Sequence, residues 1–329
     1  MHEAPPPPTP DEVATWLSRQ PGLDGGEWRI GPKMGDVSTR QYFRAWPPAG
    51  VSLIVAWYPP ETARTYDCYR RSTRLLDAVG VRTPKILAVD SASRFMALED
   101  AGEVRLFDLD AGRSAETLFE RAVGIADRIR SLPHDEVAEL NPQLDATLML
   151  RELDQTWRVF LGGRLERKLG ERLRTALEEL CTAVTGEQAE PCHRDFMSRN
   201  LMVVGRPPDA ELVVLDHQDL RLGPRGYDLA SLLNDSCALS LRQAARLEAS
   251  CVEPGGTDHY HRLVVQRALK IVGTFHAFAA RGVARYLPMV PRALETALDH
   301  LAALPERADL AAELRRQLLD PQRRTGPVP

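Results

Sequence analysis

The spacing of hydrophobic positions changes about a third of the way along the chain, and this change predicts two differently built parts. Residues 27–57 hold the runs QYFRAW and VSLIVAWY, which are rich in aromatic and β-branched residues and are separated by the turn-forming PPAG. This pattern predicts a β-hairpin. A second strand pair is expected in 84–100 on either side of SAS, and helical spacing over 61–79 ends at Gly80.

Beyond residue 114 the apolar spacing is mostly that of amphipathic helices. An island at 191–216 interrupts it, where NLMVV and ELVVLD are typical of two short strands around GRPPDA. Near the start of the chain, Thr9, Pro10 and Glu12 form a helix-start signature, which predicts a short helix to about Gln20. The other helices are expected at 114–131, 144–161, 165–185, 226–236, 257–281 and 290–303.

Strands followed by helices predict an α+β fold with two lobes. The length of 329 residues fits this division, since domains usually hold roughly 100–200 residues. We expect a proline-rich segment with a short helix in 1–24, a small lobe in 25–98, a hinge in 99–102 and a large lobe in 103–329.

Composition narrows the classes of partner. The net charge of -4 argues against a protein that binds nucleic acid, because such proteins usually carry a basic surplus. The start MHEAPPPPTP lacks the basic and apolar segments of a signal peptide, and no apolar run approaches the ~20 residues of a membrane span. The five cysteines include no CxxC pair. We therefore expect a cytoplasmic protein that does not bind a membrane and needs no obligate protein partner.

Candidate chemistry gathers in HRDFMSRN, residues 193–200, and at the end of ELVVLD. If the two short strands pair in an antiparallel ladder, Asn200 at the start of one meets Asp216 at the end of the other. Oxygen ligands in small number suit Mg²⁺, which shares its remaining positions with water and phosphates. Asp195, a further carboxylate in the same loop, could orient a hydroxyl nucleophile, although residues of these types also cap turns.

HRDFMSRN followed by DHQD resembles the catalytic and metal loops of protein-kinase-like phosphotransferases, whose pattern is H-R-D-x-x-x-x-N and a later D-F-G. His-Gln replaces Phe-Gly here, and GPRGYDLASLL follows. These features resemble the aminoglycoside-phosphotransferase branch, in which a small molecule is the acceptor. The resemblance implies a protein-kinase-like two-lobe fold and ATP and Mg²⁺ as cofactors.

Within that branch, six stretches between about residues 28 and 300 resemble the anomeric N-acetylmuramate/N-acetylglucosamine kinases of bacterial cell-wall recycling. They are GDVSTRQYFR, SLIVAWYPPE, GVRTPKILAVD, MALEDAG, LRELDQTW and DHQDLRLGPRGYDLASLLND. This resemblance implies transfer of the γ-phosphoryl group of ATP to an anomeric sugar hydroxyl. The alternatives are an aminoglycoside, choline or homoserine kinase of the same fold and, from another class, a nucleotide-binding pseudokinase scaffold.

The resemblance also implies roles for individual residues. Asp195 would accept or orient the proton of the acceptor hydroxyl, and Asn200 and Asp216 would hold Mg²⁺. His193 and Arg194 would support the loop, and Asp228 would tie it to the next helix. Phosphate contacts are expected from Gly35, Ser38, Thr39 and Arg40, and backbone contacts with adenine from Leu98 and Glu99 in the hinge.

The acceptor site is expected beside Asp195. Glu152 and Trp157 on one helix are candidates for sugar contacts, against the alternative of a solvated glutamate and a core tryptophan. Gln218 and Asp219 are alternatives for the same place. One departure from the kinase pattern stands out: SLIVAWY lacks the third-strand lysine that pairs with the phosphates. The four lysines are at 33, 85, 168 and 270, and Arg40 or a main-chain nest is expected to act in place of the missing one.

Overall fold

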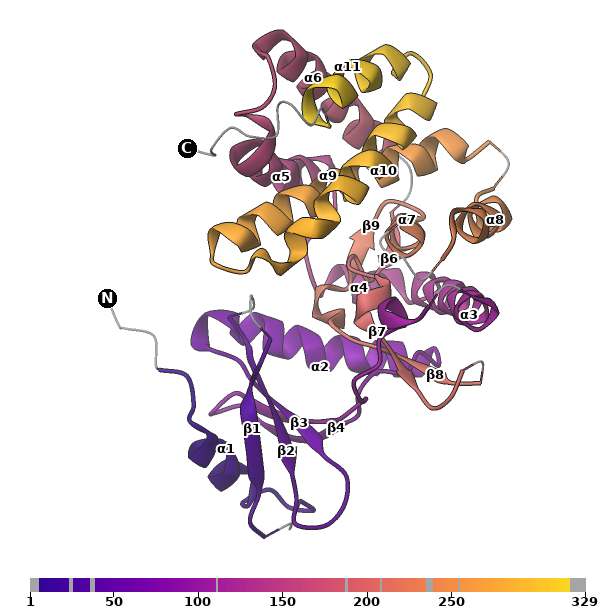
Figure 1. Cartoon of the computed structure of the whole chain (residues 1–329). Helices are drawn as coiled ribbons and strands as arrows, with labels where there is room; N and C mark the ends of the chain where they lie inside the picture. The colour runs from indigo at the N-terminus through magenta and orange to yellow at the C-terminus, as the bar shows by residue number, and fades with distance from the viewer. Residues whose placement is uncertain are drawn as a thin grey trace.

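The chain folds into a small lobe around a sheet and a larger, mainly helical lobe, as Figure 1 shows for this computed structural model. The structure describes residues 6–23, 26–35, 39–110, 112–186, 189–207, 209–234, 239–253 and 255–319. Ser38, expected at the phosphates, lies outside these residues. The predicted α+β organisation in two lobes is confirmed.

The small lobe contains one antiparallel sheet with the strand order β1-β2-β3-β5-β4. Its β2 alternates buried and half-buried side chains, as a strand with one face on a core must. The first strand of the sheet, RIGPKM, lies in the predicted strand region 27–57. The strands are β1 (Arg29–Met34), β2 (Gln41–Trp46), β3 (Leu53–Trp57), β4 (Ile86–Asp90) and β5 (Phe95–Glu99).

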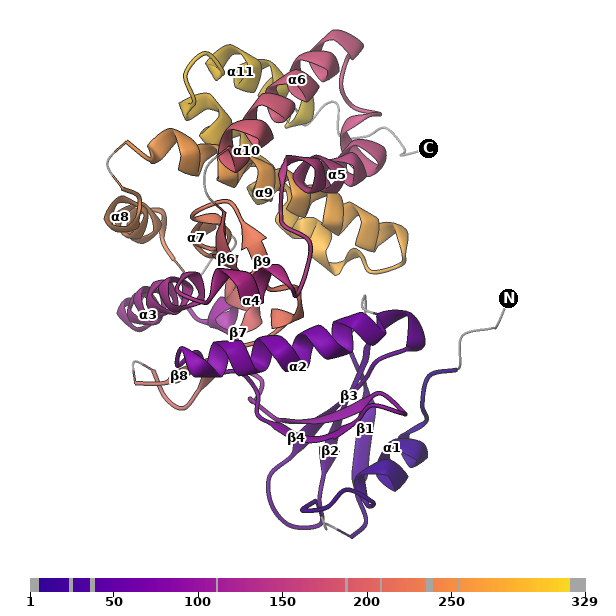
Figure 2. The ribbon, with the colours of Figure 1, turned by 180° about the vertical axis from the view of Figure 1, so that it is seen from behind.

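Helices cover both faces of this sheet. α1 (Pro10–Leu17) has the predicted capping box and packs Val13, Trp16 and Leu17 on the face that carries Phe43. α2 (Ala63–Ala78) packs on the opposite face and lies between the sheet and the large lobe (Figures 1 and 2). The short helix expected in a separate segment 1–24 therefore contributes to the core of the small lobe.

The large lobe is built around α9 (Thr257–Ala280), which packs against α5, α6, α7 and α10. The six predicted helices after residue 114 are present, whereas α4, α8 and α11 were not expected. The other helices are α3 (Arg113–Arg130), α4 (His134–Ala138), α5 (Ala146–Thr156) with its π-helical extension η3 (Trp157–Leu161), α6 (Arg167–Thr185), α7 (Tyr227–Asn234), α8 (Leu241–Cys251), α10 (Val290–Ala303) and α11 (Ala308–Leu318). No helix among the described residues is long and apolar enough to cross a bilayer.

Glycine at one position lets α9 approach α5 closely. A Cβ atom added to Gly273 would lie 2.2 Å from Oγ1 of Thr156, so a side chain there would push the helices apart. The Thr156 hydroxyl donates to the carbonyl of Leu269 at 2.9 Å. This contact fixes the position of α5 relative to α9. It lies one helical turn away from the residues of the two helices that face the site.

Two short antiparallel pairs hold the loops of the site. β7 (Leu201–Val204) pairs with β8 (Glu211–Val214), with Leu201 opposite Val214, which confirms the predicted hairpin. β6 (Glu190–Cys192) pairs with β9 (Arg221–Gly223), and this pair was not expected from the sequence. The two pairs enclose residues 193–200 on one side and 215–220 on the other.

Candidate active site

The β7/β8 hairpin brings Asp195, Asn200 and Asp216 to one end. Leu215 donates its N–H to the carbonyl of Asn200 at 2.8 Å, so Asp216 directly follows this contact. The Asn200 side-chain amide donates to the carbonyl of Asp195 at 2.9 Å. This bond uses Nδ2 and leaves Oδ1 as the ligand atom. Asp195 and Asp216 keep 29% and 45% of their side-chain surface exposed, so both carboxylates are accessible.

Both loops carry backbone strain at this end. Arg194 and Asp216 have φ values of 75° and 54°, in the left-handed region that non-glycine residues seldom occupy. The buried carboxylate of Asp228 accepts the N–H groups of His193 and Arg194 at 2.6 and 2.9 Å and so fixes the first loop. Burial raises the pKa of Asp228 above its ordinary value, even though it accepts both bonds.

His193 lies inside the protein rather than in the site. Its side chain is fully buried, and Nε2 is 2.9 Å from the carbonyl of Leu215. It therefore connects the HRD loop to the loop that carries Asp216. Its burial and this contact are those of a supporting residue, as the resemblance implied.

Two cations on α9 face Asp195. Arg267 Nη1 lies 2.9 Å from Oδ1 of Asp195, and Lys270 Nζ lies 3.5 Å from the same atom. Burial alone would raise the pKa of Asp195, but these cations outweigh it and hold the pKa well below its ordinary value. The carboxylate is therefore ionised and oriented before any substrate binds.

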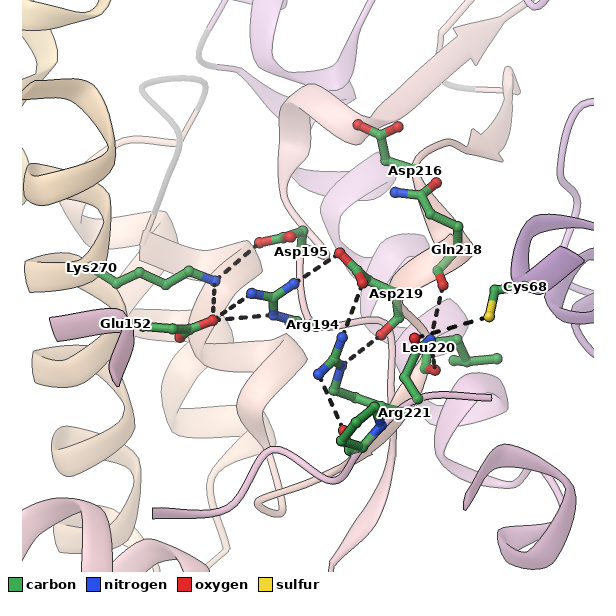
Figure 3. Close-up of polar contacts among 12 residues, drawn as sticks. Cys68, Glu152, Arg194, Asp195, Asp216, Gln218, Asp219, Leu220, Arg221 and Lys270 are labelled. Carbon is green, nitrogen blue, oxygen red and sulfur yellow. Dashed lines mark hydrogen bonds and ion pairs between the residues drawn. The ribbon is translucent and has the colours of Figure 1, made fainter. Parts of the chain in front are cut away.

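A network of ion pairs surrounds this centre, and Figure 3 shows its members pointing toward one another. The Arg194 guanidinium contacts Glu152 at 2.5 Å and Asp219 at 2.8 Å. Asp219 also contacts Arg221 at 3.0 Å. Glu152 and Asp219 thus have cationic partners, and only 9% of the Glu152 side chain is exposed. Glu152 is not solvated, and its contacts are with the network.

Trp157 packs in the helical core. Its side chain is 8% exposed, and the guanidinium of Arg174 on α6 lies 4.0 Å from the ring centroid. Gly170, also on α6, is the residue on which a Cβ would touch the ring at 3.7 Å. We therefore do not retain Trp157 as a sugar-stacking residue, and the alternative of a core tryptophan describes its place.

Gln218 lies beside Asp216 in the turn η5 (His217–Asp219), where Figure 3 shows its amide next to the carboxylate. Asn141 fixes the backbone of this turn by donating to the carbonyls of Gln218 and Leu220, each at 3.0 Å. Within the described part of the chain, the buried Oε1 of Gln218 has no hydrogen-bond partner. A buried acceptor of this kind is expected to find a partner, and a bound ligand would supply one.

A cleft of about 460 Å³ lies between the lobes and ends at Asp216. Its lining is mostly apolar, which suits a flat base, with the charged Glu99 and Asp100 at the hinge and Asp216 at the other end. The residues that line it include Met34, Gly35, Tyr42, Ile54, Leu98, Glu99, Asp100, Ala101, Gly102, Met202, Leu215 and Asp216.

The hinge contacts differ in detail from the expectation. Glu99 donates its N–H to the carbonyl of Lys85 at 2.9 Å, and its carboxylate pairs with Arg82. Leu98 belongs to β5, which lies between β3 and β4 in the sheet. The Glu99 N–H is therefore already used by the sheet. Among the described residues, no hydrogen bond engages the backbone of Ala101, two residues further along and also in the cleft.

Arg40 reaches across the cleft from the small lobe. Its Nη2 lies 3.5 Å from Oδ1 of Asp216, and only 14% of its side chain is exposed. Gly35 has φ of 77°, which favours glycine, and exposed Thr39 precedes Arg40. Arg40, which was expected near the phosphates, therefore contacts Asp216, the expected metal ligand.

Sequence reasoning missed Arg267 and Lys270 as residues of the site. The signal was present in QRALK, where Gln266, Arg267 and Lys270 interrupt the otherwise apolar stretch 263–273 of this helix. Gln266 donates to Glu152 at 3.2 Å, so all three residues point to the same network. Polar residues that are buried in this way need partners, and only the fold shows which ones.

Comparison with known proteins agrees with this geometry. The model of the phosphotransferase enzyme family (APH) matches residues 32–263. The N-acetylmuramate/N-acetylglucosamine kinase of Pseudomonas aeruginosa is 32% identical over 307 residues, which cover 86% of this chain and 88% of that protein. The corresponding kinase of Neisseria meningitidis is 30% identical, over 88% of this chain and 91% of that protein.

A solved structure shares the fold at low sequence identity. A choline/ethanolamine kinase family protein from Mesorhizobium loti superposes with a TM-score of 0.59 at 16% identity, covering 93% of this chain and 98% of that one. Such a likeness establishes the protein-kinase-like fold and nothing about the acceptor. The family match and the identity to curated kinases go further: this chain is an enzyme and belongs to the phosphotransferase (APH) family.

Proposed function

We propose that this enzyme is an ATP- and Mg²⁺-dependent sugar kinase that phosphorylates the anomeric hydroxyl of N-acetylmuramate or N-acetylglucosamine. The observation that carries the proposal is that hydrogen bonds join the loops of Asp195, Asn200 and Asp216 at one end of the β7/β8 hairpin, where Asp216 lines the interlobe cleft. The names of the relatives from Pseudomonas aeruginosa and Neisseria meningitidis support the choice of acceptor. The product would be the sugar 1-phosphate.

The donor set fits Mg²⁺. Asn200 offers Oδ1 because its Nδ2 donates to Asp195, and Asp216 offers an accessible carboxylate. These are hard oxygen ligands without a sulfur or imidazole group, as Mg²⁺ prefers. When bound, the ion would compensate negative charge on the nucleotide phosphates.

Asp195 would orient the acceptor hydroxyl and receive its proton. The neighbouring cations keep this carboxylate ionised and make it a weak base. A weak base suits the anomeric hydroxyl, which is the most acidic on the ring because the ring oxygen withdraws charge. Positioning and compensation of charge would supply most of the rate, as in other phosphoryl transfers.

The cleft would hold the nucleotide with its base near the hinge and its phosphates near Asp216. We propose that adenine pairs with the backbone of Ala101, since the N–H of Glu99 is used by Lys85. The side chain of Leu98 would line the base pocket. Arg40, Thr39 and the backbone around Gly35 would contact phosphates, and Arg40 would take the place of the third-strand lysine.

The acceptor would lie beside Asp195, with Gln218 as a hydrogen-bonding side chain. The three carboxylates around this place, Glu152, Asp195 and Asp219, already contact cations. A polycationic aminoglycoside, or the quaternary ammonium of choline, would bring positive charge to a cluster in which these three carboxylates already contact four cations, Arg194, Arg221, Arg267 and Lys270. This electrostatic argument favours an uncharged or anionic sugar.

We also propose a cytoplasmic location. The four cysteines that the structure describes, Cys68, Cys181, Cys192 and Cys251, are free thiols, as in reducing compartments. ATP, the proposed donor, is a cytoplasmic metabolite. The small-molecule acceptor and the nucleotide are the partners that the site requires.

A panel of acceptors tests the proposed function. The purified protein with Mg²⁺ and ATP is offered N-acetylglucosamine, N-acetylmuramate, kanamycin and choline, and release of ADP is followed. We expect acceptor-dependent ADP with the two amino sugars alone. Release with kanamycin or choline, and none with either sugar, would refute the assignment.

A further inference from the structure

Lys270 comes from the middle of α9, 75 residues after Asp195 in the sequence, and ends at the catalytic carboxylate. Its Nζ lies 3.5 Å from Asp195 and 3.2 Å from Glu152, and 12% of its side chain is exposed. Figure 3 shows the extended side chain pointing into the space between these two carboxylates. Burial of a charged lysine costs free energy of folding unless partners or a function compensate for it, so this placement calls for an explanation.

Holding the network together does not require Lys270. The carboxylate of Glu152 already contacts Arg194 and accepts a hydrogen bond from Gln266. Asp195 has a closer cation in Arg267, at 2.9 Å and with 3% of its side chain exposed. Both carboxylates therefore have another partner that fixes them.

The contacts of Lys270 are also the loosest in the network. In the described part of the chain, Nζ is buried without a hydrogen bond, although two carboxylates lie within ion-pair distance. An ammonium group has three donors, and its flexible stem lets it change partners at little cost. Arg267, in contrast, holds Asp195 at 2.9 Å through Nη1 of its planar fork, although its own Nε has no hydrogen bond among the described residues.

The reaction would change the charges around Lys270. In the proposed transfer, the O–H bond of the acceptor breaks and its proton moves to Asp195. The acceptor oxygen forms a bond to the γ-phosphorus as the bond from that phosphorus to the β-phosphate oxygen breaks, and ADP leaves. Asp195 loses its negative charge in this step, while the phosphoryl group, with negative charge on its three oxygens, moves onto the acceptor oxygen close by.

We propose that Lys270 is a catalytic residue whose ammonium group moves from Asp195 to the transferred phosphoryl group in the transition state. The hydroxyl must lie about 2.6–3.2 Å from an oxygen of Asp195, which brings its oxygen within reach of an ammonium 3.5 Å from that carboxylate. The inference rests on the proposed phosphoryl transfer. It assigns a cation to the acceptor side of the site, opposite Arg40 on the nucleotide side.

The test compares Lys270→Met, which keeps the length of the side chain, with Lys270→Arg, which keeps the charge. Lys168→Met, on exposed α6 surface, is the matched control. For Lys270→Met we expect kcat to fall at least about a hundredfold, as when one transition-state donor is removed, with KM for ATP within threefold. The kcat of Lys270→Arg is expected to be at least tenfold higher than that of Lys270→Met. The control is expected to have the kcat of the wild type.

A second measurement separates a catalytic role from a structural one. Aluminium fluoride with ADP and Mg²⁺ mimics the phosphoryl group in flight, so the wild type is expected to bind ADP more tightly when fluoride complexes are present. In Lys270→Met, the gain in ADP affinity caused by the fluoride complexes should be at least tenfold smaller than in the wild type. Its affinity for ADP alone should equal that of the wild type. Unchanged ADP binding also shows that the variant is folded.

Three results would overturn the inference. One is a kcat of Lys270→Met within fivefold of the wild type, and another is a retained fluoride enhancement. The third is a loss confined to N-acetylmuramate with N-acetylglucosamine unaffected, because Lys270 would then bind the acceptor's carboxylate. A wild type inactive on both sugars would refute the proposed function instead, while the fluoride measurement, which needs no acceptor, would still test Lys270.

Discussion

Arg40 of the small lobe and Asp216 of the large lobe form an ion pair at 3.5 Å across the cleft. The pair matters because β3, which reads LIVAW, has no lysine to offer the phosphates. Arg40 lies where the small lobe can supply a cation, and it contacts the residue expected to bind the metal. A bound nucleotide with its metal would therefore meet Arg40 and Asp216 together.

Replacing Arg40 by Met should weaken use of the nucleotide. We expect kcat/KM for ATP to fall on the order of tenfold to a hundredfold, because a charged contact with the phosphates is removed. Steady-state kinetics with ATP varied measure the effect. Arg29→Met is the control, since Arg29 lies at the far end of β1 over the ring of Trp46. Equal kinetics for the two variants would exclude Arg40 from the phosphate site.

Asp216→Asn should make the enzyme need more Mg²⁺. The substitution removes the anionic ligand, so we expect activity to fall at least about a hundredfold and the Mg²⁺ midpoint to rise. A titration of activity with Mg²⁺ at fixed ATP measures both. Asp209→Asn is a matched control at the tip of the same hairpin, where the carboxylate is 94% exposed. An unchanged midpoint in Asp216→Asn would place the metal elsewhere.

Gly273→Ala should damage the site from a distance. The added methyl group would overlap Thr156, so α5 and α9 must separate, and Glu152 and Lys270 move with them. We expect a loss of stability of about 1–3 kcal/mol, as for overpacking, together with lower kcat. Thermal or urea unfolding and steady-state kinetics measure the two effects.

Gly124→Ala is the control for this change. Gly124 lies inside α3, and nothing lies within 4 Å of a Cβ built there. Alanine at this position should leave kcat unchanged and stabilise the helix by roughly 0.5–1 kcal/mol. If both alanine variants behaved alike, the close approach of α5 and α9 would not limit the site.

Stability should fall in acid because of a half-buried histidine pair. Nδ1 of His261 and Nδ1 of His300 share a hydrogen bond of 2.8 Å, and Glu248, Asp258 and Asp299 lie around them. Burial, with His261 nearby, lowers the pKa of His300 from 6.5 to about 4. Between these pH values the unfolded chain binds a proton that the folded protein does not, so stability rises with pH and is flat above 6.5.

The slope expected from His300 is on the order of 1 kcal/mol per pH unit across that window. Urea unfolding at several pH values measures it. His300→Gln should flatten the dependence, whereas His134→Gln, at the exposed start of α4, should leave it unchanged. An unaltered slope in His300→Gln would mean that other groups cause the acid sensitivity.

Local signals in the sequence were sufficient for much of the fold. The capping box of Thr9 and Glu12 gave the start of α1, and the alternation in QYFRAW gave β2. The pairing of two short apolar runs was enough to bring Asn200 close to Asp216, because register follows from the hairpin. α8 and α11 were missed, although their apolar positions follow a helical spacing comparable with that of α3 and although Ser240 and Gln243 form a capping box at the start of α8.

Contacts between distant residues could not be predicted. Lys270 and Asp195 are 75 residues apart and meet only in the folded large lobe, and no local pattern states this. The expected adenine contact at Glu99 was similarly affected, because the N–H of Glu99 donates to the carbonyl of Lys85, which directly precedes β4. Trp157 was a candidate for stacking on a sugar ring, but α6 covers its side chain in the fold.

The central claim is that Asp195 directs phosphoryl transfer to the anomeric hydroxyl of an N-acetyl amino sugar. Phosphorus NMR of the product tests it most directly, with N-acetylglucosamine and its methyl 1-glycoside as paired acceptors for the wild type and for Asp195→Asn. We predict sugar 1-phosphate from the free sugar, none from the glycoside, and at least about a hundredfold slower formation by Asp195→Asn. Phosphorylation of the glycoside, or a kcat for Asp195→Asn within tenfold of the wild type, would contradict the account.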